Sequence, residues 1–110
     1  MTETDIQRNI LLGLGMYPCI NVFRMNNGGV YDNKRGCYRK SGTWHPHGMA
    51  DIMVMTDKGV MWIEVKKPGE KQSDDQIKFQ GICEKHGVSY GVAHSLDEAR
   101  KLLQYWGIEI

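Results

Sequence analysis

The first apolar pattern along the chain is helical. Residues 3–14 carry four aliphatic side chains on one helical stripe, namely Ile6, Ile10, Leu11 and Leu14. Thr2 stands directly before this stripe, and a threonine oxygen can accept a hydrogen bond from a free N–H of the first turn. Glycines near residues 13–15 suit the end of the helix. The pattern therefore predicts a capped helix over residues 3–14.

Apolar runs rich in β-branched side chains predict strands over residues 20–25, 50–55, 60–65 and 88–93. The second and third runs are separated by only four residues, including Asp57 and Gly59, which suit a tight reversal. We therefore expect these two strands to form an antiparallel hairpin. The stretch between residues 27 and 48 keeps no sustained period, which indicates a long loop or a poorly formed hairpin. Loops of this length in small domains are usually functional.

Two more helices are predicted by the capping-box spacing, in which a serine is followed three residues later by glutamine or glutamate. Ser73 and Gln76 open one helix, and Ser95 and Glu98 open the other. We expect both helices to pack through apolar side chains: Ile77, Phe79, Ile82 and Cys83 in the first, and Leu96, Ala99, Leu102 and Leu103 in the second. The element order is then αβββαβα. This order predicts an α/β fold with a central mixed sheet flanked by helices.

The length of 110 residues is typical of one domain, so we treat residues 1–110 as a single unit. The three cysteines are widely spaced and form no CxxC pair, so neither a disulfide framework nor a zinc ribbon is indicated. Cys37 with the two histidines of His45-Pro46-His47 fits no standard zinc spacing either. No apolar run approaches the roughly 20 residues that cross a membrane. We expect a soluble protein of the reducing cytoplasm with no organic cofactor.

Positive charge is concentrated in one segment, although the formal net charge is only +1. Residues 33–48 contain no acid and four cations: Lys34, Arg35, Arg39 and Lys40. Tyr31, Tyr38 and Trp44 are interleaved with them. Such a mixture can contact phosphates and stack on exposed bases, or it can form a solvated surface loop, part of a core or a dimer contact. The segment alone does not decide between these interpretations.

The candidate chemistry lies on the strand predicted over residues 60–65. Glu64 and Lys66 are two positions apart, so both point to the same face of a strand that is otherwise built for burial. A buried charge costs several kcal/mol unless it is paired or binds a metal. Asp51 opens the neighbouring strand, and Gly48-Met49-Ala50 before it would let the chain approach a ligand closely. The two carboxylates, with the Val65 carbonyl, suit Mg²⁺ or Mn²⁺, whereas a simple ion pair with Lys66 is the alternative.

This arrangement resembles a known family of nucleases. Asp51 followed thirteen residues later by Glu64-Val65-Lys66, in an αβββαβ order, resembles the PD-(D/E)xK superfamily, and within it the VRR-NUC (virus-type replication-repair nuclease) domain. The other matching residues are Glu3 and Gln7, the stretch Arg24-Met25-Asn26-Asn27-Gly28, Gly48-Met49-Ala50, and Gln76. Ala50 replaces the proline of the superfamily name, which changes backbone stiffness and removes no ligand.

The resemblance implies a restriction-endonuclease-like core and a divalent-metal nuclease acting on DNA. It implies that Asp51, Glu64 and the Val65 carbonyl bind the metal and that Lys66 is the catalytic cation. Glu3 and Gln76 would be auxiliary catalytic residues. From the residues alone, Glu3 can instead serve the helix dipole, and Gln76 can be only the capping partner of Ser73.

For the substrate, the resemblance implies branched DNA cut by a homodimer, as in Holliday-junction resolvases. The candidate DNA-binding residues are Arg24, Lys34, Arg35, Arg39, Lys40 and Lys67. Apolar residues at the C-terminus, such as Tyr105, Trp106 and Ile108, can form a dimer patch or close the core. The alternatives are a monomeric flap or single-strand nuclease, and a catalytically silent DNA-binding module.

Overall fold

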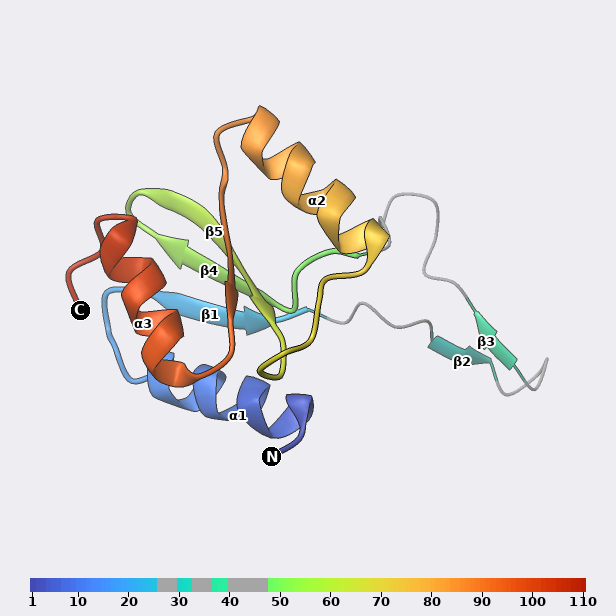
Figure 1. Cartoon of the computed structure of the whole chain (residues 1–110). Helices are drawn as coiled ribbons and strands as arrows, with labels where there is room; N and C mark the ends of the chain where they lie inside the picture. Colours follow the sequence, from blue (N-terminus) through green and yellow to red (C-terminus); the bar gives the residue numbers. More distant parts are fainter. Residues whose placement is uncertain (26–29, 33–36, 40–47) are drawn as a thin grey trace.

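The computed structural model describes residues 1–25, 30–32, 37–39 and 48–110 (Figure 1). The elements follow in the order α1 (Glu3–Leu14), β1 (Asn21–Arg24), β2 (Val30–Asp32), β3 (Cys37–Arg39), β4 (Ile52–Thr56), β5 (Gly59–Val65), α2 (Asp74–Lys85), β6 (Ser89–Ala93) and α3 (Leu96–Tyr105). The first helix and the four strands of the central sheet lie within two residues of their predicted bounds, and the other two helices begin where their capping boxes predict. β2 and β3 form a short antiparallel hairpin within the long connecting stretch.

The central sheet has four strands in the order β1-β4-β5-β6. β1 pairs with β4, and β4 with β5, in antiparallel fashion, whereas β5 and β6 are parallel. The expected hairpin of β4 and β5 is confirmed, and so is the mixed sheet. The parallel pair requires a crossover, and α2 supplies it.

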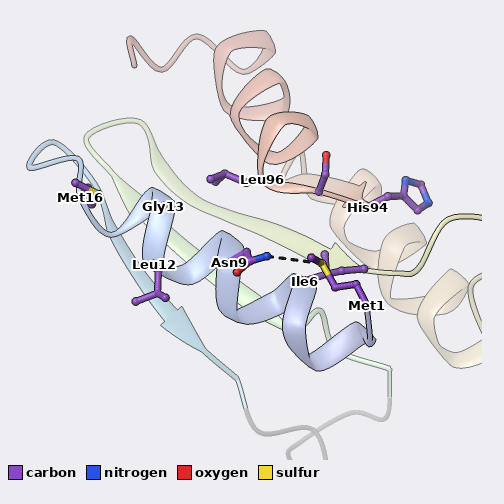
Figure 2. Close-up of a pocket in the computed structure, with 9 residues that line it drawn as sticks. Met1, Ile6, Asn9, Leu12, Gly13, Met16, His94 and Leu96 are labelled. Carbon is purple, nitrogen blue, oxygen red and sulfur yellow. Dashed lines mark hydrogen bonds between the residues drawn. The ribbon is translucent and has the colours of Figure 1, made fainter.

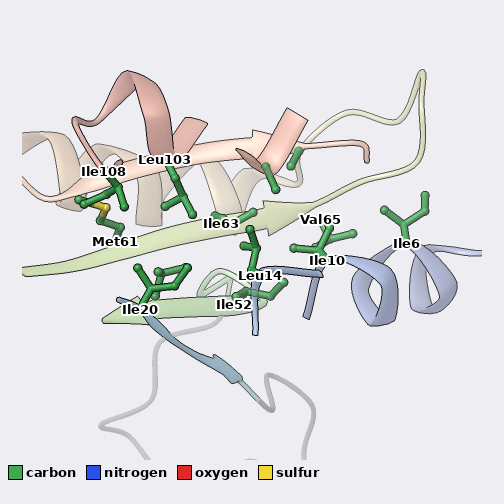
Figure 3. Packing of buried hydrophobic residues seen from close by; sticks show 13 residues of the cluster. Ile6, Ile10, Leu14, Ile20, Ile52, Met61, Ile63, Val65, Leu103 and Ile108 are labelled. Carbon is green, nitrogen blue, oxygen red and sulfur yellow. The ribbon is translucent and has the colours of Figure 1, made fainter. Parts of the chain in front are cut away.

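α1 and α3 cover one face of the sheet, and the main core lies between this face and the two helices (Figure 3). Ile10 and Leu14 of α1 and Leu103 of α3 are completely buried there, against Ile52 and Ile63 of the sheet. Because side chains alternate along a strand, the residues between these inward positions must face the opposite side of the sheet. Trp62 and Glu64 of β5 are two such residues. Because the main core takes the other residues of β5, Glu64 must lie on the opposite face of the sheet.

α2 covers part of that second face through a small stripe. Phe79 and Cys83 are its buried apolar side chains, and the Phe79 ring meets Trp62 edge to face at 5.4 Å. Ile77 and Ile82, which were also expected to pack, are 53% and 52% exposed, so that expectation is wrong. Phe79 and Cys83 are four residues apart on one narrow stripe, and the two isoleucines lie on either side of it.

The three helices are capped by side chains, though not identically. Thr2 and Ser73 form complete capping boxes at α1 and α2. Ser95 accepts from the Glu98 N–H at the start of α3, but the Glu98 carboxylate bonds the N–H and Nδ1 of His94 instead of returning to Ser95. The reciprocal half of the predicted box is therefore absent at α3, because the neighbouring histidine offers two donors to the same carboxylate oxygen.

The C-terminal apolar residues mostly close the core. Ile108 is buried, and Trp106 packs against the main core, whereas Tyr105 is 86% exposed. They do not form the continuous exposed patch that a C-terminal dimer contact would need. None of the helices in the described parts of the chain is long and apolar enough to span a membrane.

An apolar groove of about 480 Å³ lies between α1 and the start of α3 (Figure 2). Ile6, Leu12 and Leu96 are among its lining residues, and His94 stands at one end of it. Gly13 shapes the groove, because a Cβ there would lie 2.4 Å from a methyl carbon of Leu96. Since Asp51, Glu64 and Lys66 do not line this groove, it is separate from the candidate site.

Candidate active site

Asp51 and Glu64 meet at the edge of the sheet where β4 begins and β5 ends. Ile52 pairs with Ile63 in the antiparallel register, so the next pair outward is Asp51 opposite Glu64. The Asp51 Oδ2 accepts a hydrogen bond from the Val65 N–H at 2.9 Å. This bond fixes the Asp51 carboxylate across the end of the hairpin, beside that of Glu64.

Glu64 is a fully buried carboxyl group, with no exposed surface. Burial, followed by the nearby charge of Asp51 and a carboxyl–carboxyl contact with it, raises the pKa of Glu64 to about 8. Lys66 acts in the opposite direction and lowers this pKa. The Glu64 Oε2 is buried with no hydrogen-bond partner among the described residues. A buried acceptor without a donor is costly, so this oxygen is suited to a ligand from outside the chain.

Lys66 follows directly on β5 and is 9% exposed. Its backbone N–H donates to the Ala93 carbonyl at 3.2 Å, so β6 fixes its position. Its ammonium lowers the pKa of both Glu64 and Glu3. Asp51, Glu64 and Lys66 are therefore brought together at one end of the sheet, as expected from the sequence.

Gln76 both caps α2 and contacts the candidate site. Its Oε1 accepts the Ser73 N–H at 2.8 Å and completes the capping box of α2. Its Nε2 donates a short hydrogen bond to the Glu64 Oε1. One amide thus caps the helix and holds the buried carboxyl group.

Gln76→Glu separates the two roles, because glutamate still caps the helix but cannot donate to Glu64 while it is ionised. At pH 5 we expect the variant and the native protein to have the same free energy of unfolding. At pH 8 the variant should be the less stable of the two, because the new carboxylate at position 76 repels Asp51 and the ionising Glu64. Urea unfolding at both pH values measures this. Gln76→Ala, which loses the cap as well, should already be less stable at pH 5; equal curves for Gln76→Glu and the native protein at pH 8 would contradict the Glu64 contact.

Glu3 lies at the start of α1 and faces the same site. Burial and a carboxyl–carboxyl hydrogen bond with Glu70 raise its pKa, while the charge of Lys66 lowers it. Asp51 adds a smaller repulsion. Glu70 was not singled out in the sequence; its only signal was its place after the Pro68-Gly69 break, just beyond Lys66.

Gly48 brings the chain into β4 past the first turn of α2. Its φ is +81°, and a Cβ there would lie 2.4 Å from the Asp75 carbonyl carbon and 2.6 Å from the Gln76 nitrogen. The sequence suggested a close approach to a ligand here, whereas the close approach that the structure describes at Gly48 is to the backbone of α2. It sets Asp51 at a fixed position relative to Gln76.

Gly48→Ala is expected to lower the free energy of unfolding by more than the roughly 1–2 kcal/mol of left-handed backbone strain, because α2 must also move. Gly69→Ala is the matched control, since Gly69 has a similar φ of +87° and nothing within 4 Å of an added Cβ. Urea unfolding of both variants makes the comparison. Equal losses would mean that the contact with α2 is unimportant.

The predicted DNA-binding residues are only partly described. Arg24 is exposed at the end of β1, and the next residue, Met25, donates its N–H to the Asp51 carbonyl at 2.8 Å. Lys67 is exposed beside Lys66 and lies 3.9 Å from the Glu70 carboxylate. Arg39 is the last residue of β3. Lys34, Arg35 and Lys40 lie outside the described residues, as do Trp44, His45 and His47.

The donor set suits a hard divalent cation that keeps several water ligands. Among the described residues, no group of three or more His, Cys, Asp or Glu side chains is arranged to hold a metal ion. Two carboxylates and a backbone carbonyl remain: Asp51, Glu64 and Val65. The orphaned Glu64 oxygen and the repulsion between the two acids fit a bound cation of this kind.

Comparisons with known proteins agree with this geometry. The sequence model of the VRR-NUC domain matches residues 39–97, which is more than half of the chain. This chain belongs to the VRR-NUC family. A solved structure described as a VRR-NUC domain superposes with a TM-score of 0.61 at 20% identity, over 94% of this chain and 96% of the other. No curated protein gives a significant match.

As a VRR-NUC domain, the chain has a nuclease-type function with DNA as the implied substrate. The matched region contains Asp51, Glu64, Lys66 and Gln76. α1, with Glu3, precedes it, but the superposed VRR-NUC structure extends over nearly the entire chain. The predicted family and its α/β fold are thus confirmed.

Proposed function

We propose that this VRR-NUC protein is a divalent-metal-dependent DNA endonuclease that hydrolyses phosphodiester bonds in branched DNA. The observation that carries the proposal is the pair of opposed carboxyl groups, Asp51 and Glu64, beside the nearly buried Lys66. A protein that only binds DNA needs cations and gains nothing from clustered acids near phosphates. Such a cluster with a lysine at its side is suited to phosphoryl chemistry.

Asp51, Glu64 and the Val65 carbonyl would hold Mg²⁺ or Mn²⁺. When bound, such an ion polarises a phosphoryl oxygen and lowers the pKa of a coordinated water molecule. Glu64 must lose its proton to serve as a ligand, and Lys66 assists by favouring the ionised carboxylate. The Val65 N–H holds Asp51 and the Gln76 amide holds Glu64, so both carboxylates are oriented in advance.

Lys66 provides the positive charge for the reacting phosphate. Its ammonium neutralises charge that develops on the phosphoryl oxygens and helps to orient the attacking water. The Lys66 backbone is held by the Ala93 carbonyl, and the side chain, which is 9% exposed, lies close enough to Glu64 and Glu3 to lower the pKa of both. Glu3 contributes a further carboxylate to the same region and can act through a water molecule.

DNA would approach from the side of the β2–β3 hairpin. The chain leaves the site at Met25, which bonds to Asp51, and returns at Gly48, which packs on α2. The sequence between them carries the cations Lys34, Arg35, Arg39 and Lys40. Arg24 and Lys67 flank the catalytic edge. Together these six cations would contact the phosphates on either side of the scissile bond.

A homodimer is the form we propose for cutting branched DNA. A domain of 12.6 kDa offers little surface for DNA, and two sites related by a twofold axis would cut two strands symmetrically. Phe23, Met55 and Val60 support pairing, because they are exposed apolar side chains on the sheet face beside α2. A monomeric flap or single-strand nuclease is the second candidate, since the active site would be the same.

The test is cleavage of labelled four-way junction, flap, single-stranded and duplex DNA with Mg²⁺, Mn²⁺ or EDTA, beside a folded Lys66→Ala variant. Metal-dependent, paired incisions in the junction are expected, with loss in the variant. Cleavage of the other substrates alone would retain the active site and replace the resolvase-like function by the flap or single-strand one. No cleavage under any condition would leave a DNA-binding module, which a mobility-shift assay would detect.

A further inference from the structure

We propose that Tyr90 and Gln72 are positioning residues for Glu64, acting through Ser73 and Gln76. This inference rests on the proposed metal-dependent function and names residues outside the VRR-NUC signature discussed above. The relevant groups form a continuous polar path from β6, across the start of α2, to the buried carboxyl group. Each link in that path is a hydrogen bond or a peptide bond.

The path begins with the Tyr90 hydroxyl, which accepts a hydrogen bond from the Gln72 Nε2 at 2.9 Å. The same Nε2 donates to the Gln80 Oε1 on α2 at 3.0 Å. Gln72 therefore ties β6 to α2 from the connection that links β5 to the helix. The Tyr90 ring lies against Phe79, with ring centroids 5.9 Å apart, so the hydroxyl group is held in place by packing.

Gln72 directly precedes Ser73, the N-cap of α2, so anchoring Gln72 also anchors the Ser73 N–H. That N–H binds the Gln76 Oε1, which leaves the Nε2 of the same amide to face Glu64. The order matters because a side-chain amide has one donor end and one acceptor end. If the Ser73 N–H moved away, the Gln76 amide could turn and present an oxygen to the carboxyl group.

The surroundings of the path explain why it needs an anchor. Residues 67–71, between Lys66 and Gln72, are exposed, so little packing holds this connection. Tyr90, in contrast, lies on the same face of the sheet as Glu64. Tyr90 pairs with Trp62 and Val92 with Glu64, and paired residues of neighbouring strands face the same side. Burial, followed by the nearby charge of Glu64, raises the pKa of the Tyr90 hydroxyl. Loss of a group that hydrogen-bonds a metal ligand, as Gln76 bonds Glu64, commonly weakens metal binding by about 10- to 100-fold, and Tyr90 and Gln72 act on that bond from further out.

The test compares Tyr90→Phe and Gln72→Met with Thr56→Val. The first keeps the ring and removes the hydroxyl, and the second keeps the length and removes the amide. Thr56→Val also removes hydrogen bonds, but at the β4–β5 turn, away from the site. The first readout is the Gln76 side-chain amide signal in a ¹⁵N-correlated NMR spectrum of the metal-free protein. The second is Mn²⁺ binding measured by calorimetry without DNA.

We expect the Gln76 signal to shift in Tyr90→Phe and Gln72→Met, and Mn²⁺ to bind about tenfold more weakly to both. Thr56→Val should change neither quantity. An unchanged Gln76 signal in the first two variants would overturn the proposal, whatever their cleavage activity. A shifted signal in a protein that binds no Mn²⁺ and cuts no DNA would retain the positioning path and reject the proposed nuclease function instead.

Discussion

Glu64→Gln is expected to stabilise the metal-free protein at pH 8.5 while reducing DNA cleavage by at least about a hundredfold. Glutamine keeps the Oε1 that accepts from Gln76, and its amide can donate towards Asp51, where the native protein has two acids in contact. The repulsion that raises the Glu64 pKa is thereby removed. Cleavage is lost because one of the two carboxylate ligands is gone.

The gain in stability must depend on pH in a defined direction. The pKa of Glu64 is about 8 in the folded protein and about 4.5 in the unfolded chain. Between these values the folded state binds the proton more tightly, so this group's contribution to stability is complete below pH 4.5 and declines as the pH rises to 8. The decline is at most about 1.4 kcal/mol per pH unit. Glutamine does not titrate, so the variant does not show this decline in stability.

Urea unfolding with EDTA at pH 5, 7 and 8.5 tests this prediction. The difference in unfolding free energy, variant minus native, should increase steadily over the series. A constant difference would show that Glu64 does not titrate in this range, and a variant less stable than the native protein at pH 8.5 would contradict the proposed repulsion. Cleavage assays of the same preparations with Mg²⁺ or Mn²⁺ provide the second half of the test.

Lys66→Met is expected to reduce the cleavage rate at saturating metal by about 10²- to 10³-fold. Methionine fills the space of the apolar stem, so the variant should fold, but no positive charge faces the phosphate. The same loss removes the charge that lowers the pKa of Glu64, so more metal should be needed for half-maximal cleavage. Single-turnover cleavage over a metal titration measures both quantities.

Lys101→Met is the matched control for Lys66→Met. Lys101 is exposed on α3, where its Nζ lies 3.2 Å from Asp97, and this surface ion pair contributes little to stability. Its loss should leave cleavage unchanged. If Lys66→Met cut DNA as fast as Lys101→Met, the catalytic role of Lys66 would have to be abandoned.

Local patterns predicted most of the fold because they coincide with tertiary packing. α1 presents its apolar stripe to the main core, and the alternation in β5 buries Met61, Ile63 and Val65 on the face opposite Glu64. Ile77 and Ile82 were expected to be buried but are exposed, because α2 contacts the sheet through a stripe narrower than the set of apolar residues in its sequence. Such a crossing geometry depends on two distant segments and cannot be inferred from either one.

Local spacing predicted the candidate site only where its residues share a strand or a hairpin, whereas Glu3 and Gln76 were named through the family resemblance. Glu64 and Lys66 are two residues apart, and Asp51 lies across a short turn from them, so spacing alone suggested that they meet. Glu70 and Tyr90 come from a connection and from a parallel strand, and no local spacing links them to Glu64. Gln76 was ambiguous because its capping role and its contact with Glu64 use opposite ends of one amide.

The two ends of the segment that contains β2 and β3 are both fastened next to the active site. The Met25 N–H donates a hydrogen bond to the Asp51 carbonyl. Gly48 lies only three residues before Asp51 and packs on α2. Both ends of the segment are therefore anchored to the rest of the scaffold by contacts of their own. Because the entropy of closing a loop increases only slowly with its length, segments of different size and composition can be exchanged at this position at small cost. The fold thus separates a fixed frame, which carries the candidate site, from a segment whose length and sequence can vary.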